Sequence, residues 1–203
     1  MVAPRILSIS PPDRAGLRRW LARAPALVAA GADALLLRCL EPMDAGALRR
    51  LTEPAFAADL PLILHLRTAG AGALAAEVGA AVHARAGARP RGLQAGTAWS
   101  QSTHGADALV AAADWGARFA LLSPVYPPGS KPGDTRPVLG LDGLAALSAA
   151  APLPVLALGG LTPDRAAACV AAGAAGVAGI AAFGEPESIR AISEALGRRR
   201  VQR

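Results

Sequence analysis

The chain has 203 residues, of which 53% are hydrophobic and 3% aromatic, and its formal net charge is +6. This length suits one domain with a single core, which we expect to span residues 1–203, and so few aromatic side chains disfavour stacking on nucleobases as the main activity. The basic residues are almost all arginine and are spread along the chain without forming a stripe. We therefore expect a small phosphorylated or otherwise anionic substrate and not nucleic acid.

The sequence carries no pattern typical of export or membrane insertion. Residues 1–10 resemble a strand and not a leader peptide, and no apolar run reaches about 18 residues without a charge. Cys39 and Cys169 have neither metal-ligand spacing nor the spacing of a disulfide framework. We therefore expect a reduced, cytoplasmic setting without membrane contact; the sequence leaves a homo-oligomer open.

Short apolar runs alternate with longer amphipathic segments along the chain. The expected strands are residues 6–9, 34–37, 62–65, 81–83, 97–102, 119–123, 155–158 and 176–180. The expected helices are residues 13–30, a helix capped by Asp44, and residues 71–78, 106–115, 141–150, 163–172 and 186–196. Alternating strands and helices indicate an α/β fold with parallel strands, and the number eight favours a single (β/α)8 TIM barrel.

Helix ends carry the residues that such ends require. Thr162 followed by Pro163 predicts an N-cap and a proline at the first helical position. Gly31 and Gly173 lie just past the ends of predicted helices, where a left-handed residue is needed.

Two long loops interrupt this short-looped pattern, residues 87–96 and residues 124–140. In a barrel the second loop follows the sixth strand on the catalytic face, where long loops rich in proline and glycine usually clamp ligands. Lys131, the only lysine of the chain, lies in the middle of it. Its isolation in an arginine-rich sequence suggests a need for a compact ammonium group, although chance is the simpler alternative.

Glycine-bearing turns follow the seventh and eighth predicted strands. These turns contain Gly159 and Gly160, and then Gly179, Ile180 and Ala181. Glycines let a backbone approach an anion closely, and the loops after strands seven and eight form the common phosphate site of this fold. The alternative is that the glycines only make tight turns. We expect these residues to bind a phosphate group of the substrate.

Three segments resemble the C-terminal half of thiamine phosphate synthases: "LLSPVYPPGSKPG", "LPVLALGGLTPDR" and "AAGAAGVAGIAAF". The resemblance covers about residues 100–185 well and the first half loosely. It implies an enzyme that joins hydroxymethylpyrimidine diphosphate to a thiazole phosphate. In such an enzyme diphosphate leaves, a pyrimidine carbocation forms, and the thiazole nitrogen captures it.

The resemblance also implies roles for individual residues. Arg38, Ser102 and Lys131 correspond to groups that contact the diphosphate, and Ser130 to a hydroxyl residue of the long loop. Gly160, Ile180 and Ala181 correspond to the backbone that binds the thiazole phosphate. A departing diphosphate needs cations where charge develops, which suits an arginine fork and a lysine. For Arg38 the alternative is an ion pair at the barrel rim with Glu41.

The sequence departs from the family at its metal site. An asparagine–aspartate pair is replaced by His65 and Leu66, a second aspartate is missing from "VHARAGARP", Leu40 replaces a lysine, and Pro128 replaces a hydroxyl residue. Mg²⁺ prefers hard oxygen ligands, which leucine cannot supply. Mg²⁺ would therefore enter only with a diphosphate substrate. Cations that could partly replace the metal are available nearby: Arg67, Arg85 and Arg89.

Two other readings remain open at this point. One is a diverged relative similar to the thiazole tautomerases, which binds thiazole phosphate or thiamine phosphate without the coupling step; Pro124 stands where that group has its acid–base histidine. Another is a different phosphosugar barrel such as an isomerase, against which the loop with Lys131 argues. His104 is the leading titratable candidate and His83 the second, although a lone histidine is more often structural.

Overall fold

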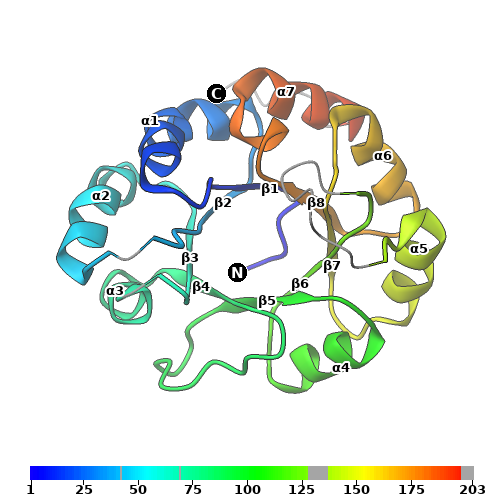
Figure 1. The fold of residues 1–203 in the computed structure, drawn as a ribbon, viewed down its shortest axis with the longest axis horizontal. Helices are drawn as coiled ribbons and strands as arrows, with labels where there is room; N and C mark the ends of the chain where they lie inside the picture. The colour runs from blue at the N-terminus through cyan, green and yellow to red at the C-terminus, as the bar shows by residue number, and fades with distance from the viewer. Residues whose placement is uncertain (42, 69, 128–136, 198–203) are drawn as a thin grey trace.

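The computed structural model describes residues 1–41, 43–68, 70–127 and 137–197. Eight parallel strands close into a barrel in chain order (Figure 1). The strands are β1 (Ile6–Ile9), β2 (Ala34–Leu37), β3 (Leu62–His65), β4 (Ala81–Ala84), β5 (Trp99–Thr103), β6 (Ala120–Leu122), β7 (Val155–Leu158) and β8 (Gly176–Gly179). The expected (β/α)8 barrel is confirmed.

Helices surround the barrel on its outside (Figure 1). They are α1 (Arg14–Ala30), α2 (Ala45–Ala57), α3 (Ala71–Val78), α4 (Ala106–Asp114), α5 (Gly140–Ala150), α6 (Pro163–Ala171), α7 (Pro186–Ala195) and a short 3-10 helix, η1 (Ala182–Gly184). The connection from β4 to β5, residues 85–98, is described throughout and contains no helix. None of the helices in the described part of the chain is long and apolar enough to cross a membrane.

The helix ends follow the capping residues seen in the sequence. The side chain of Asp13 accepts a hydrogen bond from Gly16 N (2.7 Å), and that of Asp44 accepts one from Ala47 N (2.7 Å). Gly31 closes α1 at φ +119°, a left-handed conformation that glycine adopts without strain. Thr162 occupies the N-cap position of α6, as predicted, but its side chain makes no capping hydrogen bond.

Alternation along each strand sends side chains to two separate apolar layers. One layer lies between the sheet and the helices and includes Leu35 and Leu37. The other fills the barrel interior and contains Leu7, Ile9, Ala34, Leu36, Ile63, Phe119, Leu121, Leu156 and Ala178. Continuing this period by two residues from Leu36 and Ile63 places Arg38 and His65 on the interior side at the ends of their strands.

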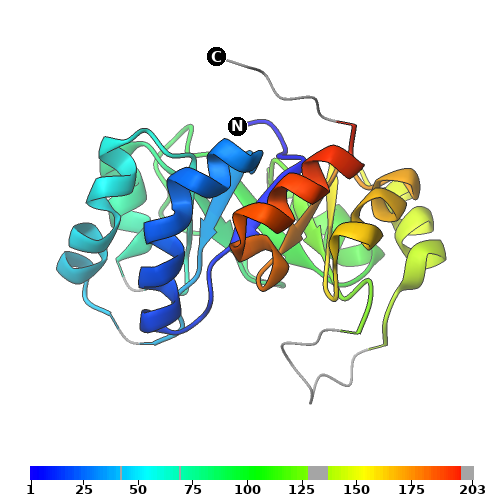
Figure 2. The same cartoon turned by 90° about the horizontal axis from the view of Figure 1, so that it is seen from above.

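The register fixes which of these polar residues become neighbours. His65 pairs with His83 across β3 and β4, and His83 pairs with Ser100 across β4 and β5. Because all strands run parallel, their C-terminal ends meet at one end of the barrel. Figure 2 shows the N-terminal segment at the opposite end.

Candidate functional site

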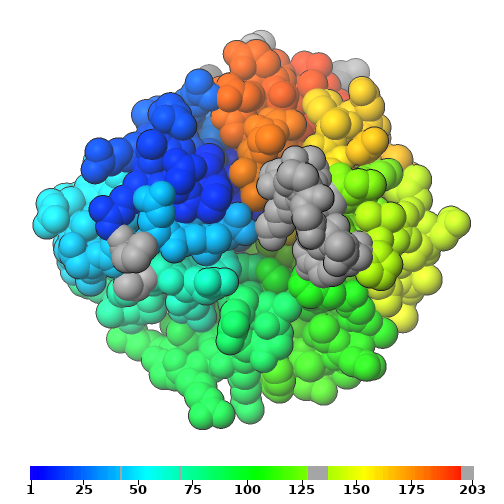
Figure 3. Space-filling view, in the orientation of Figure 1, coloured from blue at the N-terminus to red at the C-terminus, as the bar shows by residue number. Residues whose placement is uncertain are grey.

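Those residues selected from the sequence that the structure describes lie at the end of the barrel where the strands finish, which faces the viewer in Figure 3. Apart from His104, they fall into two groups. The β7–β8 cavity is formed by the turns after those two strands. The β2–β5 cluster comprises Arg38, His65, His83, Ser100 and Ser102. In Figure 3 the orange segment that follows β8 and the cyan-to-green segments that follow β3 and β4 lie on different sides of this end.

The β7–β8 cavity has a volume of about 490 Å³ and brings both predicted phosphate-binding turns together. Its lining includes all five residues proposed from the two turns, Gly159, Gly160, Gly179, Ile180 and Ala181. The backbone N–H groups of Gly160 and Ile180 have no hydrogen-bond acceptor among the described residues. Such N–H groups are suited to an anion. The geometry therefore agrees with a phosphate site.

Glycine is required at positions 159 and 160 by the chain that packs on them. Both residues have positive φ, +106° and +60°. A Cβ on Gly159 would lie 3.0 Å from Pro124 Cα, and a Cβ on Gly160 would lie 2.5 Å from the carbonyl oxygen of Pro127. The first residues after β6 thus pack directly against the turn that follows β7. The turn conformation and this close packing together account for both glycines.

Gly179 has a different reason for lacking a side chain. A Cβ at this position would overlap the ring of Phe183, which is fully buried in η1. The ring therefore needs the space above the end of β8. This packing role accounts for Gly179 independently of any ligand.

Arg165 was not selected from the sequence, yet it lines the β7–β8 cavity. It extends from the first turn of α6, its Nη1 donates to the carbonyl of Gly160 (2.7 Å), and its guanidinium lies 4.5 Å from the centroid of the Tyr126 ring. These contacts hold a positive charge beside the two turns. The signal was present in the segment "LTPDR", where an arginine closely follows the glycine turn and the helix start.

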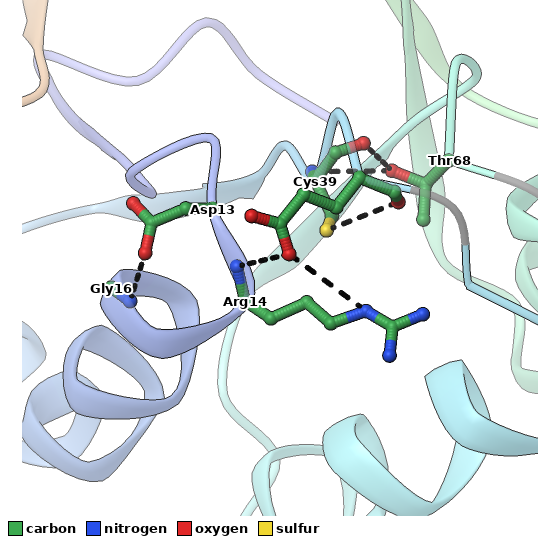
Figure 4. Close-up of polar contacts among 6 residues, drawn as sticks. Asp13, Arg14, Gly16, Cys39 and Thr68 are labelled. Carbon is green, nitrogen blue, oxygen red and sulfur yellow. Dashed lines mark hydrogen bonds and ion pairs between the residues drawn. The ribbon is translucent and has the colours of Figure 1, made fainter.

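Arg38 is half-buried, and its Nε has no hydrogen-bond partner among the described residues. Burial, and then the nearby Arg67, lower the pKa of its guanidinium. The alternative ion pair with Glu41 is wrong: Glu41 accepts from the backbone N–H of Arg14 (3.2 Å) and lies 3.9 Å from Arg14 Nε (Figure 4). The positive charge of the Arg38 guanidinium is therefore not paired with the Glu41 carboxylate.

The backbone around Arg38 is held on both sides. Arg38 N donates to Ser10 Oγ (2.8 Å), and that hydroxyl donates to the Arg38 carbonyl (3.1 Å). Cys39 N and Thr68 Oγ1 lie 3.3 Å apart, and the same hydroxyl is 3.3 Å from the Cys39 carbonyl (Figure 4). These bonds tie the end of β2 to the turns after β1 and β3, so Arg38 is fixed in place at the barrel end. Cys39 is a buried residue of this frame.

His65 is buried and neutral. Its Nδ1 accepts a hydrogen bond from the backbone N–H of Arg67 (3.0 Å), so the proton of the neutral ring lies on Nε2. Burial, together with the positive charges of Arg38 and Arg67, lowers the pKa of His65 from 6.5 to about 4. At neutral pH this ring contributes a dipole and no charge.

His83 lies between two serines of β5. Its Nδ1 is 2.8 Å from Ser100 Oγ and its Nε2 is 2.9 Å from Ser102 Oγ, and the ring centroid is 5.3 Å from that of His65. Burial, then the proximity of the His65 ring and the positive charge of Arg38, lower the pKa of His83 well below its usual value. His83, the second histidine candidate, therefore contacts Ser102.

The hydrogen bonds of Ser100 indicate the tautomer of His83. Ser100 is buried, and among the described residues its hydroxyl has no partner except His83. If His83 Nδ1 carried the proton, the Ser100 hydroxyl proton would be buried without an acceptor, which is costly. We therefore expect Ser100 to donate to Nδ1 and His83 Nε2–H to donate to Ser102. Ser102, which is partly exposed, then keeps its own hydroxyl proton for a ligand.

His104 lies at the end of β5, directed toward β6. Its Nδ1 is 2.7 Å from the carbonyl oxygen of Ser123. A carbonyl only accepts, so Nδ1 donates, and a neutral His104 has its lone pair on Nε2. The side chain is exposed. This position, beside the start of the β6–α5 loop, is compatible with the catalytic role assigned from the sequence.

Mg²⁺ does not fit the residues at the expected metal position. Leu66 and the segment after β4 line a pocket of about 220 Å³ whose other lining residues are alanines, a proline and arginines. No carboxylate faces this pocket. The described residues also contain no group of three or more His, Cys, Asp or Glu arranged for a metal. Ser130 and Lys131, the two loop residues assigned from the resemblance, lie outside the described residues.

Comparison with known proteins identifies the relatives of this chain. The family model described as thiamine monophosphate synthase matches residues 9–183. A thiamine-phosphate synthase from Methanoregula boonei is 35% identical over 103 residues, which are 50% of this chain and 45% of that protein. One from Moorella thermoacetica is 42% identical over 67 residues, 33% of this chain and 31% of that protein. The aligned part of the chain thus spans less than half the length of these curated relatives.

The structure is similar to a solved structure over nearly its whole length. A thiamine phosphate pyrophosphorylase from Pyrococcus furiosus superposes with a TM-score of 0.68, 20% sequence identity and 95% coverage of both chains. At this identity the likeness concerns the fold. The barrel described above is therefore the fold of that protein as well.

Proposed function

The chain belongs to the thiamine monophosphate synthase family, and on that premise we propose that it joins hydroxymethylpyrimidine diphosphate to thiazole phosphate. In this reaction the C–O bond to the diphosphate breaks, the diphosphate keeps the electron pair, and the thiazole nitrogen forms the new C–N bond. The product is thiamine phosphate. Residues 1–203 act as one domain in this proposal.

The observation that carries the proposal is the β7–β8 cavity. The backbone N–H groups of Gly160 and Ile180, which have no acceptor among the described residues, line the same space as Arg165. They suit a singly phosphorylated ligand, because N–H groups and a guanidinium both bind phosphate oxygens. Bound there, the thiazole phosphate would lie beside the β6 segment that carries Pro124 and precedes Lys131.

The β2–β5 cluster would face the second substrate. Arg38 supplies a fixed positive charge where negative charge develops on the leaving group, and Ser102 supplies a hydroxyl donor. Lys131 and Ser130 would approach from the β6–α5 loop, and His104 from the end of β5. Because His65 and His83 are neutral at pH 7, neither adds charge to the developing ion.

A second candidate function follows from the pocket at Leu66. Since no carboxylate lines it, the chain fits equally a relative that binds thiazole phosphate or thiamine phosphate without coupling, in the manner of a tautomerase or a regulatory binder. We place either activity in the cytoplasm, acting on small phosphorylated molecules, and leave open a homo-oligomer.

The test is a direct assay with both substrates. The purified chain is incubated with thiazole phosphate and hydroxymethylpyrimidine diphosphate, once with Mg²⁺ and once with EDTA, and thiamine phosphate is measured by chromatography. Product formation supports the coupling reaction. Saturable binding of thiazole phosphate without product supports the second candidate, and failure to bind thiazole phosphate refutes both.

A further inference from the structure

We propose that the pocket between the turns after β3 and β4, here called the arginine pocket, binds a diphosphate group directly, with guanidinium groups in place of a metal ion. The proposal takes the diphosphate substrate of the proposed function as its premise. It concerns the residues Arg67, Arg85 and Arg89, which the sequence offered as separate cations and which the structure brings together.

The three arginines line a single pocket. Its remaining lining residues are Leu66, Ala84, Ala88 and Pro90, and its volume is about 220 Å³. This volume is below the roughly 300–1,000 Å³ of pockets that enclose drug-sized molecules, so it suits a small group such as one or two phosphoryl groups.

The charges in the arginine pocket have no visible compensation. The ion pairs found in the described part of the chain join Arg14 to Glu41, Arg23 to Glu185 and Arg49 to Glu77. None of them involves an arginine of the pocket. An anion held in the pocket would supply a countercharge to these exposed arginines.

The side chain of Gln101, in β5, anchors the turn that carries two of these arginines. Gln101, which is 2% exposed, donates from Nε2 to the carbonyls of Arg85 (3.2 Å) and Ala88 (3.1 Å). Both bonds are made to the backbone, one at Arg85 and one just before Arg89. The anchoring lowers the entropy lost when the arginine side chains close on a ligand.

Arg67 connects the charge of the arginine pocket to Arg38 at the end of β2. Its charge acts on Arg38 and, after burial, lowers the pKa of the Arg38 guanidinium, whose buried Nε has no acceptor among the described residues. A buried, unsatisfied donor is costly unless a ligand completes it. A diphosphate between Arg67 and Arg38 would supply acceptors to the interior and to the pocket at once. Guanidinium groups bind such oxygens in bidentate fashion.

The experiment is calorimetric titration of the full chain with inorganic diphosphate in a buffer containing EDTA. We expect saturable binding at one site, weakened by rising salt because the contacts are ionic. Added Mg²⁺ should not tighten the binding. The single variants Arg67→Gln, Arg85→Gln and Arg89→Gln should each weaken it at least five-fold with an unchanged melting temperature.

The matched control is Arg91→Gln. Arg91 is an exposed arginine two residues beyond Arg89 in the same connection, but it does not line the pocket. Its affinity for diphosphate should stay within two-fold of the parent. The proposal is overturned by binding that requires Mg²⁺, by pocket variants that behave like the control, or by a loss in Arg165→Gln equal to that in the pocket variants. That last result would place the diphosphate in the β7–β8 cavity.

Failure of this inference is distinguishable from failure of the proposed function. Arginine-dependent diphosphate binding without thiamine phosphate formation would remove the coupling reaction and leave the pocket assignment standing. If thiamine phosphate formed only with Mg²⁺ and its formation were unaffected by substitution of the three arginines, the coupling reaction would stand and the pocket assignment would fail.

Discussion

The two sides of the barrel end present hydrogen-bond donors of different kinds. At the β7–β8 cavity the donors include the backbone N–H groups of Gly160 and Ile180, which are held by turn geometry and by the packing of the segment after β6. At the β2–β5 cluster and the arginine pocket the donors are side chains: guanidinium groups, hydroxyls and neutral imidazoles. Among the residues that line the arginine pocket there is no carboxylate.

This difference sets how each side of the site depends on the sequence. A backbone site depends on conformation, so it persists as long as glycine and the close packing persist. A side-chain site changes with each substitution of its residues, such as His65 and Leu66 at the end of β3. The phosphate of one substrate would therefore be bound in the common way, and the diphosphate of the other in a way particular to this chain.

The largest expected effect tests the backbone side. In Gly160→Ala the new Cβ would meet the Pro127 carbonyl at 2.5 Å, at a φ of +60° that alanine adopts only with strain. The turn must move away from the cavity. We expect thiazole phosphate binding to weaken about 100-fold, or about 3 kcal/mol, in calorimetric titration.

Gly116→Ala is the matched control for this variant. Gly116 has a φ of +91°, but a Cβ there would meet nothing within 4 Å, and it lies in the α4–β6 connection away from the cavity. The Gly116→Ala variant therefore has similar backbone strain but no steric clash. Its melting temperature should fall while its affinity stays within two-fold. If Gly160→Ala also kept its affinity, the cavity would not be the phosphate site.

The contrast between the two sides also marks what sequence could predict. Strands were recognisable as buried apolar runs, and the glycine turns followed from the fold rule for strands seven and eight. The meeting of Arg67, Arg85 and Arg89 depends on how the turns after β3 and β4 lie against each other, and no local pattern encodes that. The contact of His83 with Ser100 and Ser102 depends on strand register, although the period of two did place both serines on one face.

The second expected effect concerns the neutral imidazoles of the side-chain region. The pKa of His65 is lowered to about 4, with burial first and then Arg38 and Arg67 as causes; His83, which faces it, is shifted in the same direction. As pH falls below about 6.5, His65 therefore binds a proton in the unfolded chain but not in the folded chain. Stability is full above that pH and is lost as pH falls toward 4.

Chemical denaturation at pH 7.5 and pH 5 measures this loss. For His65 alone we expect the free energy of unfolding to fall by about 2 kcal/mol between these values. His65→Asn should remove most of that part of the pH dependence. The cap residues Asp13 and Asp44 provide the contrast, because their lowered pKa values place their effect below about pH 3.8. An unchanged pH dependence in His65→Asn would show that His65 is protonated in the folded state at pH 5.

A smaller effect is expected from Lys131, whose role rests on the resemblance and on its position in the β6–α5 loop. An ammonium that binds an anion contributes about 1.5–3 kcal/mol, less where solvent reaches it. Lys131→Ala should therefore weaken diphosphate substrate binding or turnover about ten-fold and leave the melting temperature nearly unchanged. Lys131→Arg should restore only part of the loss, since the two cations differ in shape. Affinity within two-fold of the parent would make Lys131 a bystander.

The smallest effect tests the hydrogen-bond chain from Ser100 through His83 to Ser102. In Ser100→Ala the donor to His83 Nδ1 is lost, so the proton of the imidazole is no longer fixed on Nε2. In part of the population His83 Nε2 is then unprotonated and accepts the hydroxyl proton of Ser102. That proton is no longer available to the ligand. We expect diphosphate affinity to fall two- to five-fold, about 0.4–1 kcal/mol, against a larger loss in Ser102→Ala.

Nitrogen chemical shifts of His83 should change from those of the Nε2–H tautomer toward those of a mixture of the two tautomers. If Ser100→Ala leaves those shifts unchanged, Ser100 does not set the tautomer. If the shifts change while affinity holds, the proton on Ser102 is not used to bind diphosphate.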